Sequence, residues 1–174
     1  MIKNSTKYFN HTLSRGMEFE HGEAITVLHR LFPHCLIMNN QVDPAESTGG
    51  KVIGPRLYRG EDREEMFVAP DFVIFNEEGI ATWVDAKLKG KSYVHAQNKR
   101  QYLTIDKQKQ EYYNSFPAWM LERFFLLFKV ETFGKVYLTG FHTNPDTIYF
   151  NNQYGTGHTP IYYVDELVDV TDDK

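Results

Sequence analysis

The chain has 174 residues, of which 41% are hydrophobic and 15% aromatic, so it can bury one core without disulfides or metals, and a single domain over 1–174 is predicted. Its one cysteine, Cys35, excludes an intrachain disulfide and a cysteine-based zinc cluster and indicates a reducing, cytoplasmic compartment. The formal net charge of -4 argues against wholesale coating of nucleic acid, and no run approaches the roughly 20 apolar residues of a membrane span.

The first part of the chain is predicted to hold a helix, a strand and a hairpin. Residues 17–32 place apolar side chains at helical spacing, which indicates an amphipathic helix. Residues 35–40, CLIMNN, indicate a short buried strand, followed by a loop to about residue 66. Residues 67–76 and 80–88 then indicate two antiparallel strands around the turn sequence NEEG. The loop is long enough for a substrate-contacting segment, and four basic residues lie in it: Lys51, Arg56, Arg59 and Arg63.

A second helix and further strands are predicted in the remainder. Residues from 104 to 116 carry a helical stripe formed by Ile105, Tyr112 and Phe116, with Thr104 or Asp106 available to cap it. Three further segments have strand patterns: 122–131, 134–141 and 147–164, the last as a strand pair around a Gly-rich turn. This order predicts an α/β fold in which helices flank a central mixed β-sheet. The core would span about 16–142, with a C-terminal β-hairpin extension over about 143–174.

Three charged residues of the hairpin, Asp71, Asp85 and Lys87, lie within or beside the apolar runs FVIF and ATWV. Alternate residues of a strand share a face, so Asp85 and Lys87 should point to the same side. If the turn centres near Glu78, Asp71 lies opposite one of residues 84–86 and approaches Asp85. Two adjacent carboxylates repel unless a divalent cation takes them as ligands. The pattern predicts a Mg²⁺ site beside Lys87, which can orient or deprotonate a water and neutralise phosphate charge.

The same motif resembles that of a nuclease superfamily. Pro70 and Asp71, then thirteen residues, then Asp85, Ala86 and Lys87, resemble the PD-(D/E)XK nucleases, which include type II restriction enzymes and archaeal Holliday junction resolvases. The resemblance covers about residues 16–130. It implies a restriction-endonuclease-like core with elements in the order αβββαβ.

In this superfamily the first helix contributes a glutamate to the site. The sequence Gly16 to Glu20 fits the GxxFE form of Mrr-like restriction nucleases, which makes Glu20 the first candidate. Glu23 also follows a glycine and is the second candidate, and Glu18 is the third.

The resemblance also implies the roles of the site residues. Asp71 and Asp85 would ligate Mg²⁺ or Mn²⁺ with the backbone carbonyl of Ala86, and Glu20 or Glu23 would bind the metal directly or through water. Lys87 would position the attacking water, and DNA would be cut to leave 5′-phosphate and 3′-hydroxyl ends. Some members use a further residue of the second helix, for which the candidates here are Lys107, Gln108, Lys109 and Tyr112. The segment between Lys89 and Thr104 is longer than in small resolvases, which leaves the type of substrate open.

A basic segment follows the hairpin. Between Lys87 and Lys109 there are seven Lys or Arg residues and one acid, Asp106. A solvated helix face or a phosphate-binding surface would both account for this run, and its position directly after the hairpin favours the second. The residues expected to contact DNA are Lys89, Lys91, Lys99, Arg100, Lys107, Lys109, Arg56 and Arg59.

Two other classes of protein are compatible with the same pattern. The first is a non-catalytic nucleic-acid-binding or assembly module of the same fold. The second is a structural protein in which Asp85 and Lys87 form an ordinary cross-strand ion pair, worth about 0.2 to 1 kcal/mol. If the protein makes two nearby cuts in DNA, a homodimer is expected. The aromatic C-terminal segment YFNNQYGTGHTPIYY could stack on unpaired bases or belong to the core.

Overall fold

A helix that changes its winding forms the first layer of the fold. The computed structural model describes residues 14–40, 56–59, 65–152 and 155–171. The helix is α-helical over 14–19, forms a π-helical turn at Glu20–Ala24 and continues as α2, Ile25–Leu31. It packs on the central sheet through four buried side chains, those of Phe19, Ala24, Val27 and Leu28. A π-turn inserts one residue into a helix and occurs frequently at functional sites.

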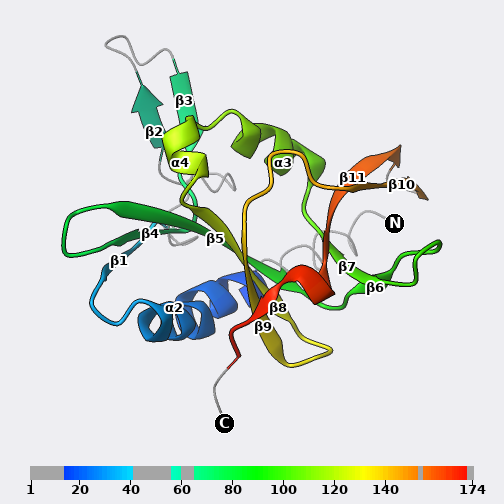
Figure 1. The fold of residues 1–174 in the computed structure, drawn as a ribbon, viewed down its shortest axis with the longest axis horizontal. Coiled ribbons are helices and arrows are strands. Elements are labelled where there is room, and N and C mark those ends of the chain that lie inside the picture. The colour runs from blue at the N-terminus through cyan, green and yellow to red at the C-terminus, as the bar shows by residue number, and fades with distance from the viewer. Residues whose placement is uncertain (1–13, 41–55, 60–64, 153–154, 172–174) are drawn as a thin grey trace.

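A six-stranded mixed sheet forms the middle layer (Figure 1). Its strands lie in the order β1-β4-β5-β8-β9-β12. They span Leu36–Asn39 (β1), Phe72–Phe75 (β4), Ala81–Lys89 (β5), Phe124–Val130 (β8), Lys135–Gly140 (β9) and Val168–Asp169 (β12). The β5 and β8 strands run parallel and the other neighbours antiparallel. The prediction of an α/β fold with a central mixed sheet is therefore confirmed.

Two short helices and a second sheet cover the other side of the central sheet. The helices are α3, Lys107–Asn114, and α4, Ala118–Leu121, which lie opposite α2 in Figure 1. The second sheet has the order β10-β11-β7-β6, with strands Thr147–Asn152, Gly155–Tyr163, Gln101–Thr104 and Tyr93–Val94. A separate hairpin, β2 (Arg56–Arg59) and β3 (Glu65–Val68), projects beside α4.

Strand alternation divides the interior into two cores. In β5, Trp83 faces the core beneath α3 and α4, whereas Val84 and Ala86 face the core beneath the first helix. In β8, Leu126 and Leu127 divide in the same way. The central sheet is therefore apolar on both faces, as expected of a sheet covered on both sides.

Several strand and helix boundaries differ from the sequence prediction. The predicted strand 67–76 is interrupted between β3 and β4, because Pro70 has no N–H to donate to a ladder. The second helix begins at Lys107 and not at Thr104, which belongs to β7, and Asp106 caps it by accepting a hydrogen bond from the Gln108 amide at 2.8 Å. The predicted loop before residue 66 contains β2, and its residues 41–55 and 60–64 lie outside the described part.

The prediction that the strand at 35–40 is buried was wrong. Leu36 is 76% exposed and Met38 is 48% exposed, because β1 is the edge strand of the central sheet. The hairpin predicted at 147–164 is confirmed as β10 and β11. Its second strand also pairs with β7, a contact between distant segments that the sequence pattern did not predict. None of the helices in the described part of the chain has the length and hydropathy that crossing a bilayer requires.

A pair of leucine substitutions tests the position of the core. Leu127→Ala should lower the free energy of unfolding by about 2 to 5 kcal/mol, because it leaves a cavity at a fully buried position of β8. Leu36→Ala, the matched control on the exposed edge strand, should change it by less than about 0.5 kcal/mol. Urea denaturation followed by circular dichroism measures both. Equal losses in the two variants would contradict the assignment of the sheet edge.

Candidate active site

The site is built at a point where β5 extends beyond its neighbour. The β4–β5 ladder begins with Phe72 opposite Val84, so the following residues of β5 have no ladder partner in β4. The amide of Ala86 donates instead to Oδ2 of Asp71 at 2.7 Å. The N–H and C=O of one strand residue point to the same neighbour, so the carbonyl of Ala86 faces this edge as well. There it accepts a hydrogen bond from Nζ of Lys87 at 3.0 Å.

The backbone that presents Asp71 is held by the end of β1. The amide of Asn40 donates to the carbonyl of Asp71 at 2.8 Å, and Nδ2 of Asn40 donates to the carbonyl of Pro70 at 3.0 Å. These two bonds, together with the bond to Ala86, fix the position of the Asp71 carboxylate between β1 and β5.

The second aspartate lies behind the first, in the interior. Asp85 is 1% exposed, and the ammonium group of Lys87 forms an ion pair with its Oδ2. The same ammonium lies 3.7 Å from Oδ2 of Asp71, so it bridges both carboxylates. From α3, Nζ of Lys109 lies 4.0 Å from Oδ1 of Asp85, and Tyr113 hydrogen-bonds to the same carboxylate.

The first helix brings Glu20 to this cluster. Its charge interacts with those of Asp71, Lys87 and Asp85. Glu23, the second candidate, forms an ion pair with Lys129 of β8 at 2.5 Å. Glu18, the third candidate, is exposed and accepts a hydrogen bond from Ser14 at 3.5 Å. Of the three glutamates, Glu20 is therefore the one that joins the aspartates, and it does so from the π-helical turn.

Burial and mutual repulsion set the protonation of the carboxyl groups. Burial and the charge of Asp71 raise the pKa of Glu20 to about 8. Burial and the charge of Asp85 raise the pKa of Asp71 to about 6. Burial also disfavours the charge on Asp85, but Lys87 and Lys109 hold its pKa below the ordinary value. Burial disfavours the charge on Lys87 as well, yet Asp85 and Asp71 hold its pKa above the ordinary value, so it remains a cationic donor here.

The donor set of this cluster is that of a hard divalent cation. It consists of the carboxylates of Asp71, Asp85 and Glu20 and the carbonyl of Ala86, all oxygen atoms of the kind that Mg²⁺ and Mn²⁺ prefer. In the described part of the chain, no three His, Cys, Asp or Glu side chains have the spacing of a formed metal-binding group. The ammonium of Lys87 lies between the aspartates, in the position for which a cation would compete. The residues fit such a cation by their chemistry.

The predicted DNA-contacting residues are distributed unevenly around the cluster. Lys109 and Lys89 lie close to it: burial and the charge of Lys87 lower the pKa of Lys89 to about 8. Arg100 is engaged elsewhere, because it pairs with Asp165 and Glu166 and stacks on Tyr163 at 3.8 Å.

The remaining basic candidates have other neighbours, are exposed, or have side chains outside the described part. Lys107 pairs with Glu111 at 3.5 Å on the exposed side of α3. Lys91 lies over the ring of Tyr93, and Lys99 is exposed with a positive φ of 60°. Arg56 and Arg59 belong to β2, where their side chains are outside the described part, as are Lys51 and Arg63 entirely.

Two residues near the cluster, Asn40 and Tyr113, were not predicted from the sequence, and the sequence did not distinguish among the four candidates of the second helix. Asn40 has no local pattern that predicts its bonds to Pro70 and Asp71. Tyr113 was detectable in principle, because it lies four residues after Lys109 and so on the same face of α3. Among the four second-helix candidates, Lys109 reaches the cluster, with its Nζ 4.0 Å from Oδ1 of Asp85. Of the predicted stripe, Ile105 and Phe116 are buried in the core, whereas Tyr112 is only partly buried. Within α3 the buried residues are Gln110 and Tyr113.

The comparisons with known proteins give no match. No protein-family model matches the chain, and no curated protein or solved structure matches it.

The free energy of unfolding of the metal-free protein should depend on pH because the carboxyl groups of the cluster repel one another when ionised. Glu20 and Asp71 have pKa values near 8 and 6, above those of the unfolded chain, so the folded state holds more protons and loses stability as the pH rises from about 5 to 8. Glu20→Gln should flatten the upper part of this profile, from about pH 6 to 8, because the amide cannot ionise. Thermal unfolding in EDTA at several pH values measures this profile.

The matched control is Glu23→Gln, which changes the other glutamate of the π-turn, paired with Lys129. It should still lose stability as the pH rises from about 6 to 8, because Glu20 can still ionise. If Glu20→Gln and Glu23→Gln flatten the profile equally, Glu20 is not the helix carboxylate of the cluster.

Proposed function

We propose that this chain is a Mg²⁺- or Mn²⁺-dependent endonuclease that hydrolyses DNA phosphodiester bonds, with a site of the PD-(D/E)XK type. The observation that carries the proposal is the convergence of Glu20, Asp71, Asp85 and Lys87 at the open edge of β5. The order of first helix, β1, β4, β5, α3 and β8 supports a restriction-endonuclease-like core of αβββαβ order. The β2–β3 and β6–β7 pairs would then be insertions into that core.

The roles follow from the contacts. Asp71, Asp85 and Glu20, with the carbonyl of Ala86, would hold the cation, which when bound supplies a Lewis acid that polarises the phosphate and activates water. Lys87 is a charged donor beside these oxygens, so it orients a water molecule toward the phosphorus and balances charge that develops on the phosphate. Lys109 and Lys89 add positive charge beside the cluster, where they bind neighbouring phosphates. The products carry 5′-phosphate and 3′-hydroxyl ends, and paired cuts in a duplex call for a homodimer.

The energetics of the cluster favour a role in function over a role in stability alone. Buried ion pairs are costly to desolvate, and replacing them with apolar residues is often neutral or stabilising. Here two carboxyl groups also have raised pKa values, so their ionised forms destabilise the fold near neutral pH. A hairpin that served only stability would gain nothing from this arrangement. A catalytically inactive DNA-binding module with the same fold would retain the basic residues without needing the three carboxylates.

Loss of Lys87 should abolish cleavage. Lys87→Ala should reduce the rate of DNA cutting in Mg²⁺ by at least about 100-fold, because the charged donor beside the phosphate is removed. The measurement is conversion of supercoiled, linear, single-stranded and branched DNA on gels, with EDTA as the metal-free reference.

Lys129→Ala is the matched control. Lys129 lies in the neighbouring strand, is ion-paired, and has a side chain 18% exposed, compared with 17% for Lys87. It should cut at the wild-type rate, and thermal unfolding should show that both variants are folded. Wild-type protein that cuts none of the four DNA forms with Mg²⁺ or Mn²⁺ would exclude the nuclease, and full activity of Lys87→Ala would exclude its role.

Metal binding separates the nuclease from the inactive module. Wild-type protein should bind Mn²⁺ in calorimetry, and Asp71→Asn should weaken this binding by at least about tenfold, because a neutral amide replaces a charged ligand. The amide oxygen of the variant can still accept the bond from Ala86, so the fold should persist. Asp146→Asn, an exposed position before β10, is the control and should bind as the wild type does. No detectable Mn²⁺ binding by wild-type protein would favour the inactive module.

A further inference from the structure

The second sheet presents an aromatic outer face. Because side chains alternate across a strand, Leu103 of β7 and Tyr162 of β11 face the main core, where both are buried. Tyr102, Ile161 and Tyr163 point the other way and form a separate small core with the partly buried Ile148; each of the three is itself buried. Beside this cluster two tyrosines remain exposed, Tyr93 of β6 and Tyr149 of β10, and exposed aromatic patches often mark binding surfaces.

A cleft of about 340 Å³ lies on this face and is lined by residues of four segments, among them Tyr93, Tyr102, Thr104, Ile148, Phe150 and Thr159. We call it the aromatic cleft. Tyr93 is 47% exposed, and its ring stacks on that of Tyr102 with 5.8 Å between centroids and 27° between planes. Phe150 lies opposite Gly157 of β11, and a Cβ at residue 157 would be 3.4 Å from its ring. The glycine lets this ring lie against the backbone, so aromatic surfaces occur on both sides of the cleft.

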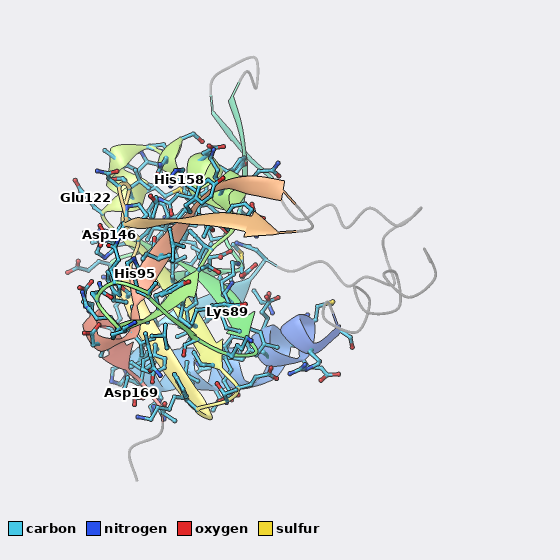
Figure 2. All side chains as sticks on the ribbon, turned by 90° about the vertical axis from the view of Figure 1, so that its right-hand side faces the viewer. Lys89, His95, Glu122, Asp146, His158 and Asp169 are labelled. Atoms are coloured by element: carbon cyan, nitrogen blue, oxygen red, sulfur yellow. The ribbon has the colours of Figure 1, made fainter. Side chains whose placement is uncertain are left out.

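Two lysines, Lys89 and Lys91, lie in the segment that leads to Tyr93. The ammonium of Lys91 lies 5.4 Å from the centroid of the Tyr93 ring. Lys89, the last residue of β5, interacts electrostatically with Lys87 and Lys109. It therefore lies near the candidate active site. The chain from Lys87 to Tyr93 can span at most about 20 Å. Figure 2 views the molecule from the side of the second sheet and labels Lys89 and His95, the latter packed edge-on to Tyr102.

We propose that the aromatic cleft binds an unpaired base of single-stranded DNA beside the active site. Stacking on tyrosine and phenylalanine rings is available to any base that is not stacked within a duplex, and the adjacent lysines provide contacts to its phosphates. The substrate class would then be DNA with a single-stranded segment. The choice of DNA as the polymer rests on the proposed nuclease function, whereas base stacking rests on the cleft alone.

Binding without metal tests this inference and avoids cleavage. In EDTA, fluorescence anisotropy should show tighter binding to an oligothymidine of about 15 nucleotides than to an abasic oligomer of equal length or to a blunt duplex. Tyr93→Ala should weaken binding to the oligothymidine by at least about fivefold and leave binding to the abasic oligomer unchanged. Tyr93→Phe, which keeps the ring, should bind as the wild type does, whereas Tyr93→Leu should behave as Tyr93→Ala does.

The control is Trp119→Ala on α4, an aromatic residue 62% exposed and not among those that line the cleft. It should bind as the wild type does. Equal affinity of wild type for the oligothymidine and the abasic oligomer, or an unchanged affinity in Tyr93→Ala, would overturn the inference. Absence of metal-dependent cutting would count against the nuclease but not against base binding, so the two failures can be distinguished.

Discussion

The hydrogen bond from the amide of Ala86 to the carboxylate of Asp71 determines the geometry of the candidate site. It replaces the ladder bond that β4 would make if it continued past Phe72. Because β4 begins only at Phe72, the carbonyl of Ala86 faces an open edge, and side chains from both layers can reach it. Glu20 approaches from the first helix and Lys109 from α3, on opposite faces of the central sheet. The site thus exists because one strand of the sheet is shorter than its neighbour.

The charges at this edge explain why the arrangement suits a cation and a phosphate. Three carboxyl groups and a bridging ammonium share a largely buried region. The pKa of Asp85 is lowered, which favours its ionised form, whereas the pKa values of Glu20 and Asp71 are raised. In the proposed function a divalent cation would relieve the repulsion between carboxylates that the metal-free protein relieves by protonation. The lysines that surround the cluster would then remain available for phosphates. The proposed base-binding cleft would extend this surface along the chain that follows β5.

The hairpin was predictable because its signals are local. Alternation in β5 and the NEEG turn place Asp71 opposite Asp85 by continuation of the observed register, in which Phe72 pairs with Val84. The buried face of α3 was only partly predictable from hydrophobic periodicity, which did not identify Gln110 and Tyr113. The start of α3 depends on Asp106 as the cap, and its buried face includes Gln110, a polar residue whose side chain donates to the carbonyl of His142 at 2.7 Å. The second sheet was also missed in part, because β6 and β7 are short and β7 pairs with a strand more than fifty residues away in sequence.

The most direct test of the account is a crystal of the protein soaked in MnCl₂ and measured at a wavelength where manganese scatters anomalously. An anomalous peak should appear, bound by Asp71, Asp85 and the carbonyl of Ala86, with Glu20 bound directly or through water. The ammonium of Lys87 should have moved from between the aspartates to the side of the ion. Aspartates that remain bridged by Lys87 at saturating manganese, with no peak at the open edge of β5, would contradict the account.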